Sequence, residues 1–173
     1  MTDGVQILVA VCDRPRTVAV KPLGRCRIGV CDVFQRFVRR FHAPDTTDIF
    51  FDLSGAESID STFAGILVAL ATKKRHPETP DVHLVHPSPS VTNTLTTMHV
   101  LPLFDICEAM PDSPTQWTAL HAEPLRPDQV PDLVIDAHQA LIDADERNEA
   151  EFGPVVDVFR AEQQRQASLE APQ

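Results

Sequence analysis

Three short polar residues, Asp60, Ser61 and Thr62, stand directly before an apolar segment that runs from Phe63 to Leu70. The apolar segment predicts a helix, so the three residues fall where the chain enters it. A helix start leaves backbone N–H groups unpaired and carries partial positive charge, and it therefore accommodates a hydroxyl, a carboxylate or a phosphate. The sequence leaves two interpretations of Ser61 open, a helix cap or a hydroxyl available for modification.

Enzymatic chemistry is the weakest interpretation of these residues. Asp52 and Asp60 could be taken for a catalytic carboxylate pair, but a structural role is the default for both. A hydrolase using Ser61 is disfavoured because no G-x-S-x-G turn surrounds it, and no G-x-x-x-x-G-K-[ST] loop is present to hold a phosphate. His83 and His86 lie three apart on a predicted strand and so point to opposite faces, which makes them a poor metal pair. We expect no enzyme, no metal site and no cofactor.

Hydrophobic patterns in the first two thirds of the chain predict strands and helices in alternation. After an opening hairpin with strands at 6–11 and 17–20, they predict a helix at 30–42, a strand at 49–51, the apolar helix, a strand at 81–86, a helix starting at Ser88-Pro89 and a closing strand at 104–108. Such alternation favours an α/β fold in which helices pack against a mixed sheet.

The order of motifs around the apolar helix resembles the centre of a STAS domain, the family of anti-sigma factor antagonists. The family pattern is a strand, Asp-Leu-Ser, a short turn, Asp-Ser-Ser/Thr-Gly and an apolar helix; here the matching residues are Asp52-Leu53-Ser54 and Asp60-Ser61-Thr62. Residues 82–91, followed by Leu95, Leu101 and Phe104, resemble the family's next strand and helix. The resemblance spans about residues 5–110, and Phe63 stands where the family usually has glycine.

The resemblance implies a STAS-like mixed β-sheet and a regulatory function. In the family, an anti-sigma serine kinase phosphorylates the serine that Ser61 matches, and Thr62 is the runner-up acceptor. The unphosphorylated protein would bind the kinase and so release a sigma factor, and phosphorylation would end this binding. A phosphatase would restore it. ATP would be bound by the kinase and not by this chain. The implied partner-binding residues are Asp52, Ser54, Asp60, Thr62 and Phe63.

Phe63 leaves two alternatives open, because its ring would either obstruct a kinase or serve as an apolar anchor for a partner. The alternative function is an unswitched STAS scaffold or regulatory subunit of a larger complex, for example the small partner of a lipid-transport ATPase.

The last third of the chain differs in composition. Residues 111–131 contain five prolines and one tryptophan and predict a surface linker. Two helical stripes follow, at 130–142 and 152–159, with Gly153-Pro154 marking the break between them. Short amphipathic helices cannot bury their apolar faces alone, so they must pack on the first domain, a second copy or a partner. We therefore expect a domain at 1–110, a linker at 111–131 and an acidic helical extension at 132–173, and a homodimer through the C-terminal helices is one expectation.

Charge and composition favour a protein partner in the cytoplasm. The net charge is −10, and residues 111–173 supply −9 of it, with 4 basic against 13 acidic side chains. Such a chain repels phosphate backbones and anionic membranes, which excludes nucleic acid as the expected partner. No stretch reaches the ~20 apolar residues of a membrane span, and the start lacks the basic region of a signal peptide. The four cysteines show no CxxC spacing, which is typical of buried, reduced thiols.

Overall fold

The computed structural model describes residues 6–12, 17–41, 48–72, 81–110, 114–121 and 125–170. Seven strands occur in this part of the chain: β1 (Gln6–Val11), β2 (Thr17–Cys26), β3 (Asp48–Asp52), β4 (Ala56–Ile59), β5 (Asp81–Val85), β6 (Asp105–Cys107) and β7 (Thr118–Leu120). It also contains five α-helices: α1 (Ile28–Phe41), α2 (Ser61–Thr72), α3 (Pro89–Thr97), α4 (Val130–Ala144) and α5 (Glu149–Glu170).

The strands form one mixed sheet in the order β6-β5-β3-β2-β1-β7, with β4 pairing beside the end of β2. β2, β3, β5 and β6 run parallel to one another, whereas β1 is antiparallel to both β2 and β7. The predicted α/β class, the opening hairpin and the mixed sheet are confirmed. The predicted start of α3 is confirmed as well, because Ser88 Oγ accepts the N–H of Val91 at 3.3 Å and Pro89 occupies the first turn.

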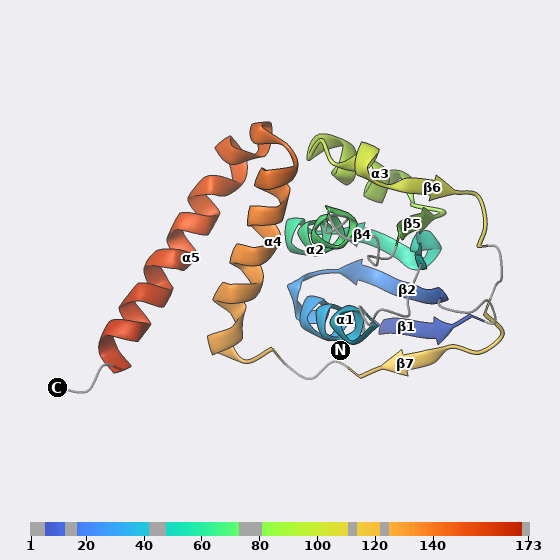
Figure 1. Ribbon diagram of the computed structural model, residues 1–173, viewed down its shortest axis with the longest axis horizontal. Coiled ribbons are helices and arrows are strands. Elements are labelled where there is room, and N and C mark those ends of the chain that lie inside the picture. The colour runs from blue at the N-terminus through green and yellow to red at the C-terminus, as the bar shows by residue number, and fades with distance from the viewer. Residues whose placement is uncertain are drawn as a thin grey trace.

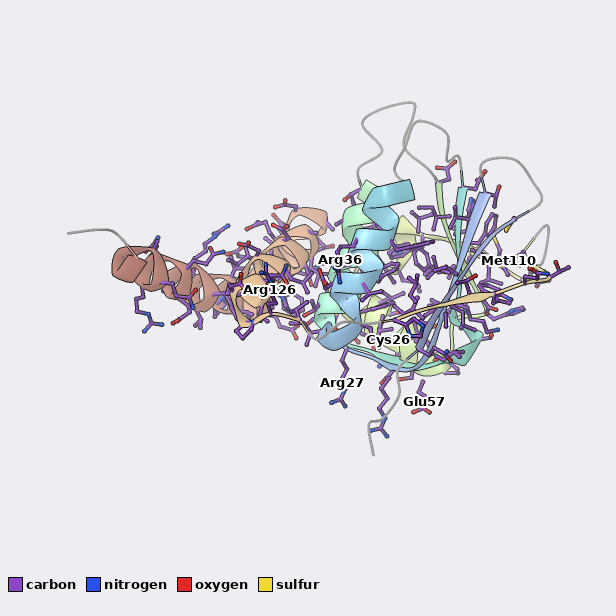
Figure 2. The ribbon with its side chains drawn as sticks, turned by 90° about the horizontal axis from the view of Figure 1, so that it is seen from below. Cys26, Arg27, Arg36, Glu57, Met110 and Arg126 are labelled. Atoms are coloured by element: carbon purple, nitrogen blue, oxygen red, sulfur yellow. The ribbon has the colours of Figure 1, made fainter. Side chains whose placement is uncertain are left out.

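The main core lies between one face of the sheet and helices α1 and α2. Three aromatic rings mark its centre: Phe34 of α1 meets Phe51 of β3 edge-on at 5.2 Å and stacks on Phe63 of α2 at 5.3 Å. Figure 2 shows the sheet nearly edge-on, with these helices on one side of it and α4 and α5 farther out on the same side. The fold is therefore layered, with α2 in an inner layer.

Helix α2 is apolar on every side, and nine of its twelve residues are buried. A helix of that kind needs cover on both faces, since neither can be left to water. The sheet covers one face and α4 packs against the other, while α5 lies along α4 (Figure 1). The C-terminal extension is therefore part of the core packing of the first domain.

Two details of the C-terminal third differ from the prediction. Within the segment expected to be only a linker, residues 118–120 form β7, which pairs with β1 and makes one edge of the sheet. Trp117 just before it packs with Met110 against Ala10, Cys12 and Ala19, on the sheet face away from the main core. The linker is thus tied to the sheet by backbone hydrogen bonds and by an aromatic contact.

The break between the last two helices is also misplaced by the prediction, because Pro154 lies inside α5. The chain turns instead at Asp145–Asn148, where the Asp145 carboxylate accepts the backbone N–H of Arg147 at 3.0 Å. Phe152 and Val156 on either side of the proline are 4% and 2% exposed. Their burial against the rest of the fold holds the helix together despite the hydrogen bond that proline cannot make.

All four cysteines are in the thiol form, and Cys12, Cys26 and Cys31 are buried as expected. Burial, reinforced by the Asp60 charge, raises the pKa of the Cys26 thiol to about 12. That thiol therefore stays protonated and inert at neutral pH. Within the described residues, no helix is both long and apolar enough to cross a membrane.

Candidate functional site

Asp60 joins the starts of two helices. Its Oδ1 accepts the backbone N–H of Phe63 at 2.8 Å, and its Oδ2 accepts the backbone N–H of Ile28 at 2.9 Å. One carboxylate thus satisfies an unpaired donor in the first turn of α2 and another in that of α1, where the helix dipoles favour negative charge. The capping role that the sequence left open for Ser61 belongs to Asp60, which leaves the Ser61 hydroxyl available for another partner.

That partner is His138 of α4. Ser61 Oγ lies 2.9 Å from His138 Nε2, and His138 Nδ1 lies 2.8 Å from the carbonyl oxygen of Val134. A carbonyl only accepts, so Nδ1 carries a proton, and in the neutral ring Nε2 then accepts the proton of the Ser61 hydroxyl. His138 is 4% exposed, whereas Ser61 is half-buried. A side chain of the extension therefore holds the one hydroxyl that the sequence singled out.

The backbones of α2 and α4 touch next to this contact. A Cβ atom added to Gly65 would lie 2.1 Å from the carbonyl oxygen of Ala137, which is closer than real side chains approach. Beyond the far end of α4, the amide of the buried Asn148 donates to the carbonyls of Leu141 at 2.8 Å and of Met98 at 2.9 Å. The extension is thus fixed at one point by close backbone contact and at another by a buried amide.

The structure places Phe63 in neither of the two roles that the sequence left open for it, an obstruction to a kinase or an apolar anchor for a partner. Its ring is 0% exposed and lies in the aromatic core, so it neither reaches a partner nor covers the Ser61 hydroxyl. A bulky residue is accommodated there because the position points into the core. Thr62, the runner-up acceptor, is 6% exposed, which leaves Ser61 the more accessible of the two hydroxyls.

Asp52 and Ser54 form a second polar group around Lys21. Lys21 Nζ lies 2.6 Å from Asp52 Oδ2 and donates to Ser54 Oγ at 3.2 Å, while Asp52 Oδ1 accepts the backbone N–H of Ser54 at 3.1 Å. Burial pushes the pKa of the Asp52 carboxyl upward, but the bonds from Lys21 and Ser54 outweigh it, and the pKa lies below its ordinary value. The carboxylate stays charged and shapes the turn after β3.

The surface near the helix starts is charged. Arg25 and Glu57 form an exposed ion pair at 3.4 Å, and Figure 2 shows Arg27 and Glu57 extending from the molecule on the same side, near Cys26. Exposed pairs of this kind contribute little to stability, so their side chains are free to exchange partners. These charged side chains are accessible to solvent, as is part of Ser61.

The Ser61–His138 pair has the geometry of a hydroxyl beside a base, as nucleophilic enzymes use. Its third member is the carbonyl of Val134, one turn earlier in the same helix, in place of a carboxylate that would stabilise a charged imidazole. The ring is also buried between helices rather than facing a ligand. The arrangement therefore fits a contact between helices better than a catalytic pair.

Among solved structures, the unphosphorylated anti-sigma factor antagonist SpoIIAA aligns with a TM-score of 0.50 and 14% identity, over 60% of this chain and 88% of that one. This chain has the STAS fold. A proposed anti-sigma factor antagonist from Thermotoga maritima aligns with a TM-score of 0.48 and 22% identity, over 59% of this chain and 86% of the other. The protein SLC26A9 aligns with a TM-score of 0.44 and 13% identity, over 59% of this chain and 21% of its own length.

No family model and no curated protein matches the sequence, so the likeness to SpoIIAA is one of architecture. The fold that the resemblance implied is confirmed. The roles of individual residues, and the domain boundaries at 110 and 131, stay predictions.

Sequence reasoning found Asp60 and Ser61 but missed the residues that fix the extension against the first domain. His138, Gly65 and Asn148 act across long separations, 77 residues in the case of Ser61 and His138. One signal was present: a helix that is apolar all round needs cover on a second face, and the extension supplies amphipathic helices that need a surface to pack on.

Proposed function

We propose that this STAS-fold protein is an anti-sigma factor antagonist whose binding to an anti-sigma serine kinase is switched off by phosphorylation of Ser61. The observation that carries the proposal is the Ser61 hydroxyl itself, half-buried in the first turn of α2 and released from capping by Asp60. The STAS fold supports the same function, since an anti-sigma factor antagonist shares this architecture.

The local charges give the switch its direction. A phosphate adds ~−1.5 to −2 charge at neutral pH. Asp60 directly precedes Ser61 and caps the same helix, so the added charge stands beside a carboxylate as well as at the positive end of the helix dipole. After phosphorylation, the surface around Ser61 would repel acidic groups of a partner. Its bound water would also be harder to remove, which makes docking more costly. Phosphorylation is therefore expected to weaken binding.

Helix α4 adds a second condition. The 2.9 Å contact with His138 Nε2 occupies the Ser61 hydroxyl, so we propose that α4 moves away before Ser61 is modified. A kinase would act only on the fraction of molecules in which α4 is displaced. The apparent affinity of the kinase for this protein would then equal its intrinsic affinity multiplied by that fraction. Conversely, a phosphate on Ser61 would keep α4 displaced, because binding and conformational change are reciprocal. The extension thus acts as a gate on the switch.

The test is phosphopeptide mass spectrometry on the protein isolated from its own cells, followed by co-purification with variants. Ser61→Ala is expected to retain a kinase-class partner and Ser61→Asp to lose it. Ser90→Asp is the matched control, because Ser90 is an exposed serine in the first turn of α3 and is expected to change nothing. An absence of phosphate on Ser61 under every growth condition, with equal partner retention by Ser61→Asp, would refute the proposal.

The alternative, an unswitched STAS scaffold or subunit, is favoured by the same cover over α2. If α4 stays in place, the hydroxyl is a structural contact and the exposed charges near Arg27 and Glu57 form a constant docking surface. Stoichiometry separates the two functions: a scaffold co-purifies in a fixed ratio with one assembly, whereas an antagonist exchanges between a kinase and a free state. A homodimer through the C-terminal helices remains a prediction that light scattering tests directly.

A further inference from the structure

On the sheet face opposite the main core, three side chains of different chemistry meet on two neighbouring strands. His83 lies on β5, and Asp105 and Cys107 lie at the two ends of β6. In the parallel register His83 pairs with Asp105, and Cys107 stands two residues further along, so all three project from the same face. Phe50, which pairs with His83 on the other side, lies on this face too.

The atoms that could hold an ion are already close together. His83 Nδ1 lies 3.0 Å from Asp105 Oδ2 and 4.0 Å from Cys107 Sγ, and that sulfur lies 3.7 Å from the same Asp105 oxygen. Zinc bonds of about 2.0–2.3 Å in a tetrahedral arrangement separate neighbouring ligand atoms by about 3.3–3.8 Å. An ion at the centre therefore requires shifts of only a few tenths of an ångström.

The surroundings orient the imidazole as an outer shell does in metal sites. His83 Nε2 lies 3.0 Å from Asp48 Oδ1, and the His83 ring stacks on Phe50 with centroids 4.4 Å apart and planes 14° apart. A carboxylate on the far nitrogen fixes the proton there and directs the lone pair of Nδ1 toward an ion. Both ring nitrogens thus face carboxylates, and either a second proton or a cation must stand between Nδ1 and Asp105.

We propose that His83, Asp105 and Cys107 bind a divalent transition-metal ion of the zinc class, with Asp48 as the outer-shell partner of the histidine. Imidazole and thiolate favour zinc-like ions over magnesium and calcium, which prefer oxygen ligands alone. The Asp105 side chain is 69% exposed, so an ion can enter from solvent and a water completes its coordination. The site is separate from Ser61 and does not depend on the proposed switch. Its direct effect is to tie the short edge strand β6 to β5.

The experiment titrates the full-length, reduced protein with Zn²⁺ by calorimetry and with Co²⁺ by absorption spectroscopy. We expect one high-affinity ion per chain and, with Co²⁺, a thiolate-to-cobalt charge-transfer band. Asp48→Asn is expected to weaken zinc binding about 10–100-fold, and Cys107→Ser to weaken it further and abolish the charge-transfer band. His121→Gln, which replaces an exposed histidine just after β7, is the control and is expected to bind like the wild type.

Two results would overturn the proposal. Zinc that binds equally well to the wild type and to Cys107→Ser would show ligands elsewhere in the chain. Cobalt that binds without a thiolate band would show that Cys107 is not a ligand. Because the Cys107 side chain is only half-buried, Cys107→Ser is expected to fold normally, and far-UV circular dichroism checks this.

Discussion

Replacing Gly65 by alanine adds a single methyl group at the place where α2 and α4 come closest. The added Cβ would lie 2.1 Å from the carbonyl oxygen of Ala137, 2.6 Å from its carbonyl carbon and 2.9 Å from its Cα. Real Cβ atoms essentially never approach closer than 3.0 Å, so the helices must separate by about 1 Å. Because the contact is with backbone, no change of rotamer relieves it.

The expected cost follows from three contributions. Overpacking of a tight interior costs ~1–3 kcal/mol, and a clash with backbone belongs at the upper end of that range. Separation of the helices also breaks the Ser61–His138 hydrogen bond, which contributes ~1 kcal/mol. Alanine recovers ~1 kcal/mol through its better helix propensity. The free energy of unfolding should therefore fall by about 3 kcal/mol, which corresponds to a Tm lower by roughly 6–12 °C for a chain of this size.

The assay is urea denaturation together with amide hydrogen exchange along α4. Gly65→Ala should lower the urea midpoint, speed exchange in α4, and raise the rate of Ser61 phosphorylation if α4 gates that residue. Gly29→Ala is the matched control, because Gly29 lies on the exposed side of α1 and an added Cβ would meet nothing within 4 Å. That variant should be as stable as the wild type or slightly more stable. If Gly65→Ala unfolds within ~0.5 kcal/mol of the wild type and protection of α4 is unchanged, α4 does not pack on α2 this closely.

Three further outcomes are expected. Asn148→Ala should lower the free energy of unfolding by ~1–3 kcal/mol in urea denaturation, because the carbonyls of Met98 and Leu141 both lose the hydrogen bond from this buried amide, whereas the exposed Asn93→Ala should have little effect. The lowered pKa of Asp52 stabilises the fold above the ordinary carboxyl pKa of about 3.9, and this contribution is lost as pH falls through the lower folded-state pKa. The stability difference between the wild type and Asp52→Asn should accordingly shrink as the pH falls below about 5 and through the folded-state pKa, and a difference that grows on acidification would contradict this assignment. A serine-reactive fluorophosphonate should leave Ser61 unlabelled in intact-mass measurements, and stoichiometric labelling would revive the hydrolase interpretation.

Local patterns predicted the first two thirds of the fold because its elements are set by nearby residues. The cap at Ser88, the apolar strand β3 and the apolar helix α2 each follow from a few consecutive side chains. Pro154 shows where this reasoning fails. Proline usually ends a helix, but the buried neighbours Phe152 and Val156 hold α5 in place, so packing outweighs a local preference.

The candidate site was predictable only in part, for a similar reason. Asp60 and Ser61 precede the helix in sequence, and their position at its start follows directly. The contact with His138 depends on how a distant helix docks, and the cluster of His83, Asp105 and Cys107 depends on which strands become neighbours. Neither is encoded in residue spacing. Phe63 was misjudged because a residue type alone does not reveal which side of a helix faces the core.

The two edges of the sheet bear on how copies of this protein meet. β6 and β7, the outermost strands, are only three residues long each. Short edge strands offer few unpaired N–H and C=O groups, so they are poor templates for a strand from another molecule. Copies of the chain should therefore resist joining their sheets into a continuous ribbon even when crowded. Any assembly that forms should use helical surfaces, for example the outward side of α5, where Val158 is 63% exposed, the highest value among the large hydrophobic side chains of the described residues.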